Sequence, residues 1–428
     1  MGAKKAQDLA SKFGLSGRVD LYYAFIFGIA QVLQQKGMAG IIVSNRFMTI
    51  KSGEAVRKHI VKRFDVLHIW DLGDTKLFNA SVLPAVLLVK PKSEGHRGVK
   101  PACTSIYSTV RIPGAQHVPD VISALETKGI VKLPSNKFFQ VLQGQLDHKN
   151  GNGEVWRIST KSFDEWLNTV ESNTYCTYRE VGKTHVGVKT NADKIFIRED
   201  WDDLPLDMQP ECLHPVITHH IARRFKAFET DHPKEILYTH RVVNGKRTPI
   251  NLDGLPRTRN YLNQYRGVLE GRKYIYEAGR QWFEIWVPQD PNVWAKPKVV
   301  FRDISDIPMF WLDFDGSIVN GDCYWITCEK RMNDDLLWLI AAIGNSSFVE
   351  AFYDNKFRNK LYSGRRRFMT QYVEQFPLPN PKSNIGLKII QLAKQIYDLI
   401  TTPKAQELEK ELNLLVWESF GVNPGKNP

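Results

Sequence analysis

Polar and aromatic side chains follow an apolar run at the point where the run ends. Residues 40–44 read Gly-Ile-Ile-Val-Ser, and Asn45 and Phe47 come directly after Ser44. An apolar segment without alternation is typical of a strand buried on both faces. Open α/β sheets bind ligands beyond the carboxyl ends of such strands, so Ser44, Asn45 and Phe47 are candidate ligand-binding residues. The alternative is that they only cap the strand.

A basic segment interleaved with aromatic residues lies between residues 241 and 280. Cations and flat rings together suit a surface that follows a phosphate backbone. For residues 261–269 an ordinary solvated helix is the favoured alternative. The cations are Arg241, Lys246, Arg247, Arg257, Arg259, Arg266, Arg272, Lys273 and Arg280, and the aromatics are Tyr261, Tyr265, Tyr274 and Tyr276.

Two shorter basic clusters lie at 223–226 and 365–367. Consecutive arginines can dock phosphates or enter a groove, although a solvated loop is an equal alternative for 365–367. The net charge of +12 and a pI near 9.3 favour a polyanionic partner, nucleic acid first, over a merely basic protein. The cluster residues are Arg223, Arg224, Lys226, Arg365, Arg366 and Arg367.

Cysteines and histidines give no metal site. Five cysteines, an odd and scattered set, indicate a reducing cytoplasm and argue against a disulfide scaffold. His219 and His220 are adjacent, and neither they nor His214 have a carboxylate or cysteine at a suitable spacing. No apolar run is long enough to span a bilayer, and no signal peptide is evident. We therefore expect a cytoplasmic protein without a membrane partner.

The elements around Ser44 follow a recognisable order. Leu21, Phe25, Ile29 and Leu33 recur four apart and predict a helix that begins after Asp20. A second helix is predicted over 53–63, and two more strands over 65–72 and 82–89. The order helix, strand, helix, strand, strand indicates a parallel α/β sheet that finishes in a β-hairpin.

This order resembles the second half of the catalytic domain of adenine-specific (N6) DNA methyltransferases of restriction-modification systems, the TaqI-like and Eco57I-like enzymes. Asp20-Leu21-Tyr22 with Phe25, the stretch 40–47, and Leu72-Gly73 leading to Phe78 carry the match. The resemblance implies S-adenosyl-L-methionine as methyl donor and extrusion of the target adenine. It also implies an adenine or cofactor cleft lined by Ser44, Asn45, Phe47, Phe78 and Asn79.

The family's two main motifs are absent from this chain. The catalytic tetrapeptide Asn-Pro-Pro-Tyr and an Asp-Pro-x-x-Gly-x-Gly-like cofactor loop lie upstream of such a helix, and no Pro-Pro dipeptide occurs here. We therefore assign no catalytic residue. Without the strand that delivers the tetrapeptide, strand 40–44 becomes an open edge. We expect either a separate polypeptide that carries the N-terminal half of the domain, or a truncated or split gene.

The remainder resembles the TaqI-like target-recognition (specificity) domain. Residues 187–196, Gly-Val-Lys-Thr-Asn-Ala-Asp-Lys-Ile-Phe, are similar to the Gly-Ile-x-Thr-Gly-x-Asn-x-x-Phe element that opens it. Asn191 stands where glycine is usual, and asparagine tolerates the left-handed conformation. Residues 336–347 and 376–379 resemble later elements of that domain. The DNA-binding residues implied are Lys189, Thr190, Arg223, Arg224, Lys226, Arg272, Lys273, Arg280, Arg365, Arg366 and Arg367.

These inferences give an α/β protein: the second half of a Rossmann-like methyltransferase sheet, an α+β target-recognition domain and a C-terminal helical pair. The expected domains are 1–92, a partial catalytic domain; 93–155, a connection; 156–380, the specificity domain; and 381–428, C-terminal helices. The expected function is part of a site-specific adenine-N6 methyltransferase that binds double-stranded DNA. The alternative is a non-catalytic DNA-binding specificity subunit, or a fragment that needs a partner. Nothing in the sequence supports an endonuclease.

Overall fold

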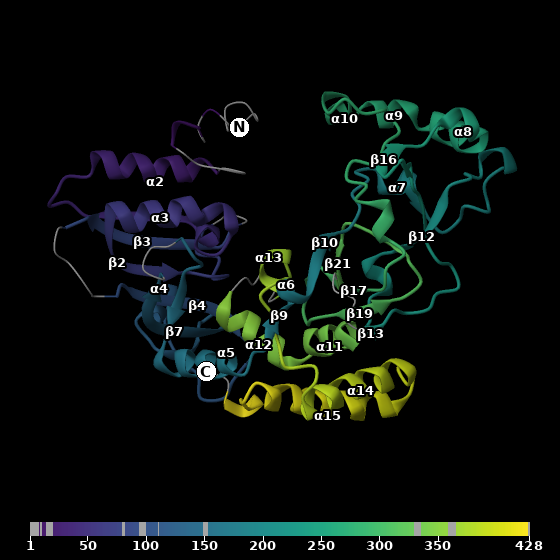
Figure 1. The fold of residues 1–428 in the computed structure, drawn as a ribbon. Helices are drawn as coiled ribbons and strands as arrows, with labels where there is room; N and C mark the ends of the chain where they lie inside the picture. The colour runs from purple at the N-terminus through teal and green to yellow at the C-terminus, as the bar shows by residue number, and fades with distance from the viewer. Residues whose placement is uncertain are drawn as a thin grey trace. The chain divides into compact units, whose positions relative to one another are not determined.

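The computed structural model describes residues 8, 11–13, 20–78, 82–93, 100–109, 111–148, 153–328, 335–357 and 365–426. The chain divides into two compact units, shown in Figure 1. The first comprises Met1–Asn168 and Tyr353–Arg367, and the second comprises Thr169–Phe352 and Phe368–Asn427.

An eight-stranded sheet forms the centre of the first unit. Its strand order is β1-β3-β2-β4-β7-β6-β5, and β8 pairs with β7. The strands are β1 (Ala39–Ser44), β2 (Phe64–Asp71), β3 (Pro84–Pro91), β4 (Ala102–Thr109), β5 (Gln116–His117), β6 (Gly129–Lys132), β7 (Phe138–Asp147) and β8 (Arg157–Ser159). The helices are α2 (Leu21–Val32), α3 (Glu54–Arg63), α4 (Val121–Leu125) and α5 (Lys161–Ser172), the last of which crosses into the second unit.

The first elements match the predicted order. Strand β3 lies between β1 and β2 and runs antiparallel to both, so β1 and β2 are parallel to each other and β2–β3 is the expected hairpin. Helix α3 packs on β2, and α2 packs on α3 (Figure 1). Tyr23, Ile26, Ile60 and Ile69 are fully buried in the core between these elements. Strand β1 lies at the edge and pairs only with β3 in the described part of the chain.

Residues 93–155 were predicted to be a connection between domains, and that prediction is wrong. Strand β4 pairs parallel with β2 and antiparallel with β7, so the described part of the segment extends the same sheet. A second core cluster, which includes Leu72, Ile106 and Phe139, lies there. The sequence signal is weak because β4 buries Thr104 and Ser105, which no apolar pattern reveals. The first unit therefore continues to about residue 168.

The second unit contains two larger sheets. One sheet has the order β10-β21-β17-β19-β13 and the other β11-β14-β12-β20. Their strands are β10 (Gly182–Val186), β11 (Ile197–Arg198), β12 (Leu213–Ile217), β13 (Phe225–Lys226), β14 (Glu235–Leu237), β17 (Lys298–Arg302), β19 (Phe310–Asp313), β20 (Ile318–Val319) and β21 (Cys323–Cys328). A separate hairpin pairs β15 (His240–Val243) with β16 (Lys246–Pro249), and three short helices follow: α8 (Pro256–Gln264), α9 (Arg266–Glu270) and α10 (Lys273–Glu277).

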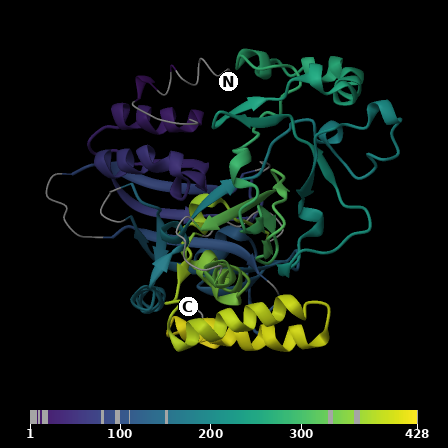
Figure 2. The same cartoon turned by 45° about the vertical axis from the view of Figure 1, so that its right-hand side comes forward.

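In the described part of the chain after β21, the helices of ten or more residues are α11 (Asp335–Gly344), α12 (Ser347–Lys356), α14 (Asn384–Asp398) and α15 (Pro403–Ser419), and a short helix, α13 (Thr370–Val373), lies between α12 and α14. Helices α14 and α15 lie side by side in Figures 1 and 2.

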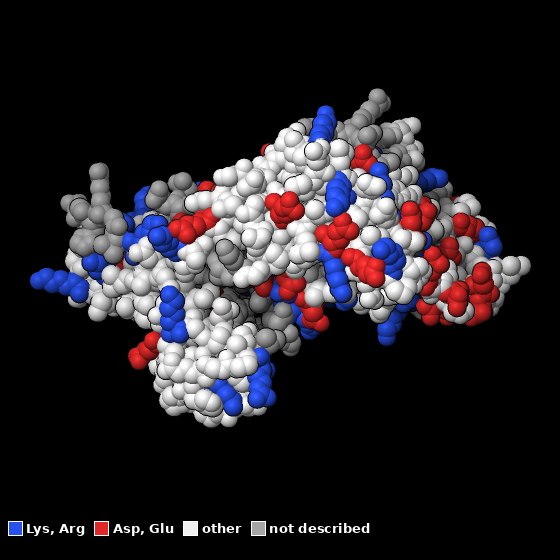
Figure 3. Space-filling view, turned by 90° about the horizontal axis from the view of Figure 1, so that it is seen from below, with Lys and Arg blue, Asp and Glu red and all other residues white. Residues whose placement is uncertain are grey.

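Figure 3 shows the face seen from below, where acidic and basic side chains are mixed. Within the described ranges no single helix is long and apolar enough to cross a membrane, although the bent pair α11–α12 would pass by length and composition.

Candidate functional site

A hydrogen-bonded group of side chains lies at the carboxyl end of β1. The Asn45 amide Nδ2 donates to Asp71 Oδ1 (2.9 Å) and to the Tyr107 hydroxyl (3.2 Å), and that hydroxyl donates to Asp71 Oδ2 (2.8 Å). Ser44 Oγ accepts from the backbone N–H of Arg46 (3.4 Å). Ser44 and Asn45 therefore cap the strand end, and both remain half-buried.

The aromatic residues expected beside them lie differently. Phe47 has no exposed surface and packs edge-on against Trp156, with ring centroids 5.6 Å apart. It cannot line an open cleft in this conformation, so that expectation is corrected: the ring anchors the segment after β1 in the core. Phe78 is exposed. Asn79 lies outside the described residues.

The loop that leads to Phe78 begins on the same group. The backbone N–H of Gly73 donates to Asp71 Oδ1 (3.3 Å), and Asp74 accepts from Ser108 N (2.8 Å). Gly73 has φ +48°, and a Cβ there would lie 2.2 Å from the carbonyl oxygen of Ile106. Only glycine fits this turn. The strand ends and the first loop residues are thus held together.

A small cavity lies next to this group. It has a volume of about 30 Å³, and its lining includes Asn45, Asp71, Cys103 and Trp156. Such a volume holds about two water molecules, far less than the several hundred Å³ typical of a cofactor pocket. The cavity at the strand end is therefore too small to enclose a cofactor.

Asp71 and Tyr107 were missed by the sequence reasoning. Asp71 is buried, ends the apolar strand β2 and immediately precedes the Leu-Gly pair. A carboxylate at the end of a buried strand was the available signal. Tyr107 lies in β4, whose pairing with β2 no local pattern predicts.

Three of the predicted DNA-binding residues are buried, which corrects their assignment as DNA contacts. Thr190 is fully buried, and its hydroxyl bonds Asp193 and accepts from the N–H of Ala192 (3.0 Å). The Arg272 guanidinium donates to the carbonyls of Thr190 (3.0 Å), Leu269 (3.2 Å) and Trp282 (2.7 Å). Arg366 forms a two-pronged ion pair with Asp354, at 2.7 Å for each contact. These groups are occupied within the protein.

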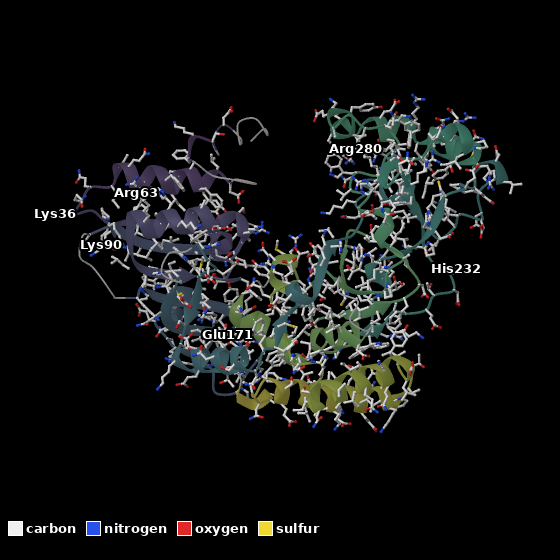
Figure 4. All side chains as sticks on the ribbon, in the orientation of Figure 1. Lys36, Arg63, Lys90, Glu171, His232 and Arg280 are labelled. Atoms are coloured by element: carbon white, nitrogen blue, oxygen red, sulfur yellow. The ribbon has the colours of Figure 1, made fainter. Side chains whose placement is uncertain are left out.

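Four more are half-buried and already engaged. Arg223 donates to the carbonyls of Lys226 (2.9 Å) and Ala227 (3.1 Å), and Lys226 lies 3.4 Å from Glu229. Arg224 lies 3.1 Å from Glu409. The fourth, Arg280, which Figure 4 labels, donates to the carbonyls of Ile285 and Trp286 and covers the Trp286 ring.

The remaining predicted cations are more accessible. Lys189, Lys273 and Arg365 are exposed, and Arg367 is half-buried. Asn191, which follows the Lys189–Thr190 pair, adopts φ +54°, as predicted for the turn that usually carries glycine. In the described ranges no three His, Cys, Asp or Glu side chains gather as they would around a metal ion.

Two family models match parts of the chain. Residues 1–78 match the family model for the Eco57I restriction-modification methylase, and residues 232–378 match the TaqI-like C-terminal specificity domain. The chain is 37% identical over 435 residues to the Type II methyltransferase M.BanIII of Aneurinibacillus aneurinilyticus, covering 99% of this chain and 74% of that protein. The chain belongs to the TaqI/Eco57I-like family of restriction-modification methyltransferases.

More distant matches agree with this family. The chain is 27% identical to the Type II methyltransferase M.BstVI of Geobacillus stearothermophilus, over 86% of this chain and 62% of that one. A solved structure of the Type IIL restriction-modification enzyme MmeI in complex with DNA has a similar fold, with a TM-score of 0.60 at 12% identity over 99% of this chain. This chain spans 53% of the MmeI chain.

Proposed function

We propose that this chain supplies target recognition, and the second half of a Rossmann-like catalytic sheet, to a site-specific adenine-N6 DNA methyltransferase. The observation that carries the proposal is the pairing, in one chain, of a methylase match at 1–78 with a specificity-domain match at 232–378. The methyl donor would be S-adenosyl-L-methionine. The target base would leave the duplex, because the amino group of a stacked adenine is unreachable.

The residues of this chain do not fit a complete site for that methyl donor. The strand-end cavity of about 30 Å³ is too small for it, and the Asp-Pro-x-x-Gly-x-Gly-like loop is absent from the sequence. We therefore assign no residue here to the methyl donor and none to the chemical step. Ser44 and Asn45 would shape one wall of the cleft, and the exposed ring of Phe78 would pack against the extruded adenine.

A surface of the first unit supports docking of the other half of the catalytic domain. Among the strands described, β1 is the edge of the sheet, and large apolar side chains on and near α2 and β1 face solvent. An exposed edge strand beside exposed apolar groups is a ready site for strand addition. Those more than half exposed are Leu21, Phe25, Val32, Met38 and Ile42. The occupant would be a polypeptide segment that carries the Asn-Pro-Pro-Tyr strand.

Complementation tests the function. The chain would be co-expressed with a polypeptide that carries the tetrapeptide and the cofactor loop, and incubated with unmethylated DNA and methyl-labelled S-adenosyl-L-methionine. Label recovered as N6-methyladenine supports the proposal. Label in cytosine overturns the adenine assignment. DNA binding without transfer in the assembled complex would favour the non-catalytic specificity subunit.

A variant pair tests the docking surface. The double variant Phe25→Asp with Ile42→Asp should abolish assembly of this chain with the polypeptide that carries the tetrapeptide, because both apolar side chains would contact that polypeptide. Ile122→Asp, on the equally exposed α4 of the same unit, is the control and should assemble normally. Equal assembly of both variants would place the partner elsewhere.

A further inference from the structure

The hairpin β15–β16 is separate from both larger sheets of the second unit. Its strands pair only with each other among the strands described, and β16 is labelled in Figure 1. Asn244 (φ +51°) and Gly245 (φ +72°) form the two-residue turn. Two consecutive positive φ angles are the signature of the type I′ turn, which matches the natural twist of paired strands. The hairpin is thus a regular two-stranded ribbon.

The base of the ribbon is fixed to the body of the second unit. His240 is buried, and its Nε2 lies 3.1 Å from Glu284 Oε2. The backbone N–H groups of Ile250 and Ile285 donate to the carbonyl and to the hydroxyl of Thr239, at 3.0 and 3.1 Å. The Arg247 guanidinium donates to the carbonyl of Gln289 (2.6 Å). The ribbon is therefore held in one orientation.

Alternation along the strands assigns the two faces. Arg241 is opposite Thr248 and Val243 is opposite Lys246, so these four share one face, while His240 lies on the other. The His240 face is turned to the body because His240 is buried. On the opposite face Arg241, Val243 and Lys246 are exposed. No carboxylate occurs between Thr239 and Ile250.

From this geometry we infer that the β15–β16 ribbon enters the major groove of duplex DNA and reads base edges with its exposed face. The inference rests on the proposed function and adds the element that gives specificity. The major groove admits a two-stranded ribbon, and Arg and Lys pair with guanine O6 and N7 there. The methyl groups of Val243 suit a thymine methyl. Because the ribbon is already rigid, little ordering entropy opposes its insertion.

The test is selection from a randomised duplex library with the full-length chain. Wild type should enrich one sequence motif. Arg241→Gln with Lys246→Gln should lose the preference at one or two base pairs and bind the selected duplex about 5- to 150-fold more weakly, as expected for lost base contacts. Lys404→Gln with Lys410→Gln removes the same charge from exposed positions of α15 and should keep the motif.

The outcomes separate this inference from the proposed function. If wild type enriches a motif and the ribbon variant enriches the same one, the ribbon does not read bases, whatever the change in affinity. If wild type enriches no motif, target recognition by this chain fails, and the ribbon inference with it. Unfolding by urea checks that the exposed substitutions leave the fold intact. Val243→Ala is a second test, because it should weaken the sequence preference at a thymine without changing the charge of the ribbon.

Discussion

The Asn45 side-chain amide donates to the Asp71 carboxylate across 2.9 Å and so ties the end of β1 to the end of β2, over the intervening strand β3. Tyr107 of β4 donates to the same carboxylate (2.8 Å). Because Asp71 also accepts from the N–H of Gly73, one carboxylate joins three strand ends to the loop that presents Phe78. The position of that ring thus depends on the register of the sheet.

Asn45→Ala should destabilise the first unit by about 1–3 kcal/mol, because it removes a hydrogen bond to a buried carboxylate. Urea unfolding measures this change. Tyr107→Phe should cost a similar amount, and the double variant should cost less than the sum, since both side chains serve Asp71. Gln140→Ala, at an exposed position of β7, is the control. Strict additivity of the first two variants would refute a shared network.

Gly73→Ala should be more harmful than Gly114→Ala. Both glycines have positive φ, +48° and +82°, so alanine is strained at either position by about 1–2 kcal/mol. At Gly114 a Cβ meets nothing within 4 Å, whereas at Gly73 it meets the backbone carbonyl of Ile106. The extra clash should add at least about 1 kcal/mol to the loss of unfolding free energy. Equal losses in thermal and urea unfolding would mean that the loop is free to shift.

The sequence predicts the elements whose signal is local. The helix after Asp20 was found from apolar periodicity, and the strand 40–44 and the hairpin β2–β3 from short apolar runs. Strand β1 is not buried on both faces as expected, since Ile42 is exposed. The segment after residue 100 was not assigned to the sheet, because β4 buries Thr104 and Ser105 and its place in the sheet is specified by its neighbours β2 and β7. Non-local pairing leaves no pattern in the segment itself.

The candidate site likewise combines residues with a local sequence signal and residues that only strand pairing brings together. Ser44 and Asn45 could be located because strand ends are visible in the sequence, but Asp71, the carboxylate that accepts from the Asn45 amide, comes from another strand. The choice of DNA contacts rested on charge, and it failed for Arg272 and Arg366 because the tertiary structure buries both side chains. The guanidinium carries five N–H donors, which can bond backbone carbonyls as well as phosphate, and sequence does not distinguish the two uses.

Arg57→Lys should destabilise the first unit by about 2–4 kcal/mol, because lysine cannot reproduce the planar donor geometry. The buried Arg57 guanidinium donates to the carbonyls of Phe47 (2.6 Å), Ile50 (2.8 Å) and Gly153 (2.6 and 2.8 Å). It thereby holds the segment after β1 against α3. Arg63→Lys makes the same substitution at an exposed position of that helix, which Figure 4 labels, and should be nearly neutral in urea unfolding. Similar losses of unfolding free energy in both variants would show that the Arg57 guanidinium does not hold this segment.

Arg365→Ala should change DNA binding, whereas Arg366→Ala should change folding stability. If the chain binds DNA through exposed Arg365, its removal should lower the slope of log affinity against log salt by about 1 and leave stability unchanged. Arg366→Ala breaks the ion pair with Asp354 and should cost about 1–3 kcal/mol of stability instead. Salt titration of duplex binding and urea unfolding separate the two. An unchanged slope for Arg365→Ala would exclude that position from the interface.

Glu211 caps helix α8 from 46 residues away, and this should make stability depend on acid pH. Its carboxylate accepts from the backbone N–H of Arg257 (3.0 Å) and Thr258 (2.8 Å) and from the Thr258 hydroxyl (2.6 Å). Partial burial alone would raise the pKa of Glu211, but the hydrogen bonds from Thr258 and Arg257 outweigh it and lower the pKa from 4.5 to about 2.

A carboxyl whose folded-state pKa is depressed stabilises the fold above its unfolded pKa and loses that contribution as pH falls toward the folded value. Glu211→Gln should therefore destabilise the chain by about 1–3 kcal/mol at neutral pH. The difference from wild type should stay constant down to pH 4.5 and shrink as pH falls toward 2. Urea unfolding across this series measures it. Glu270→Gln, which removes only the exposed pair with Arg266, should show a small difference at every pH. A Glu211→Gln difference that grew in acid would contradict the capping role.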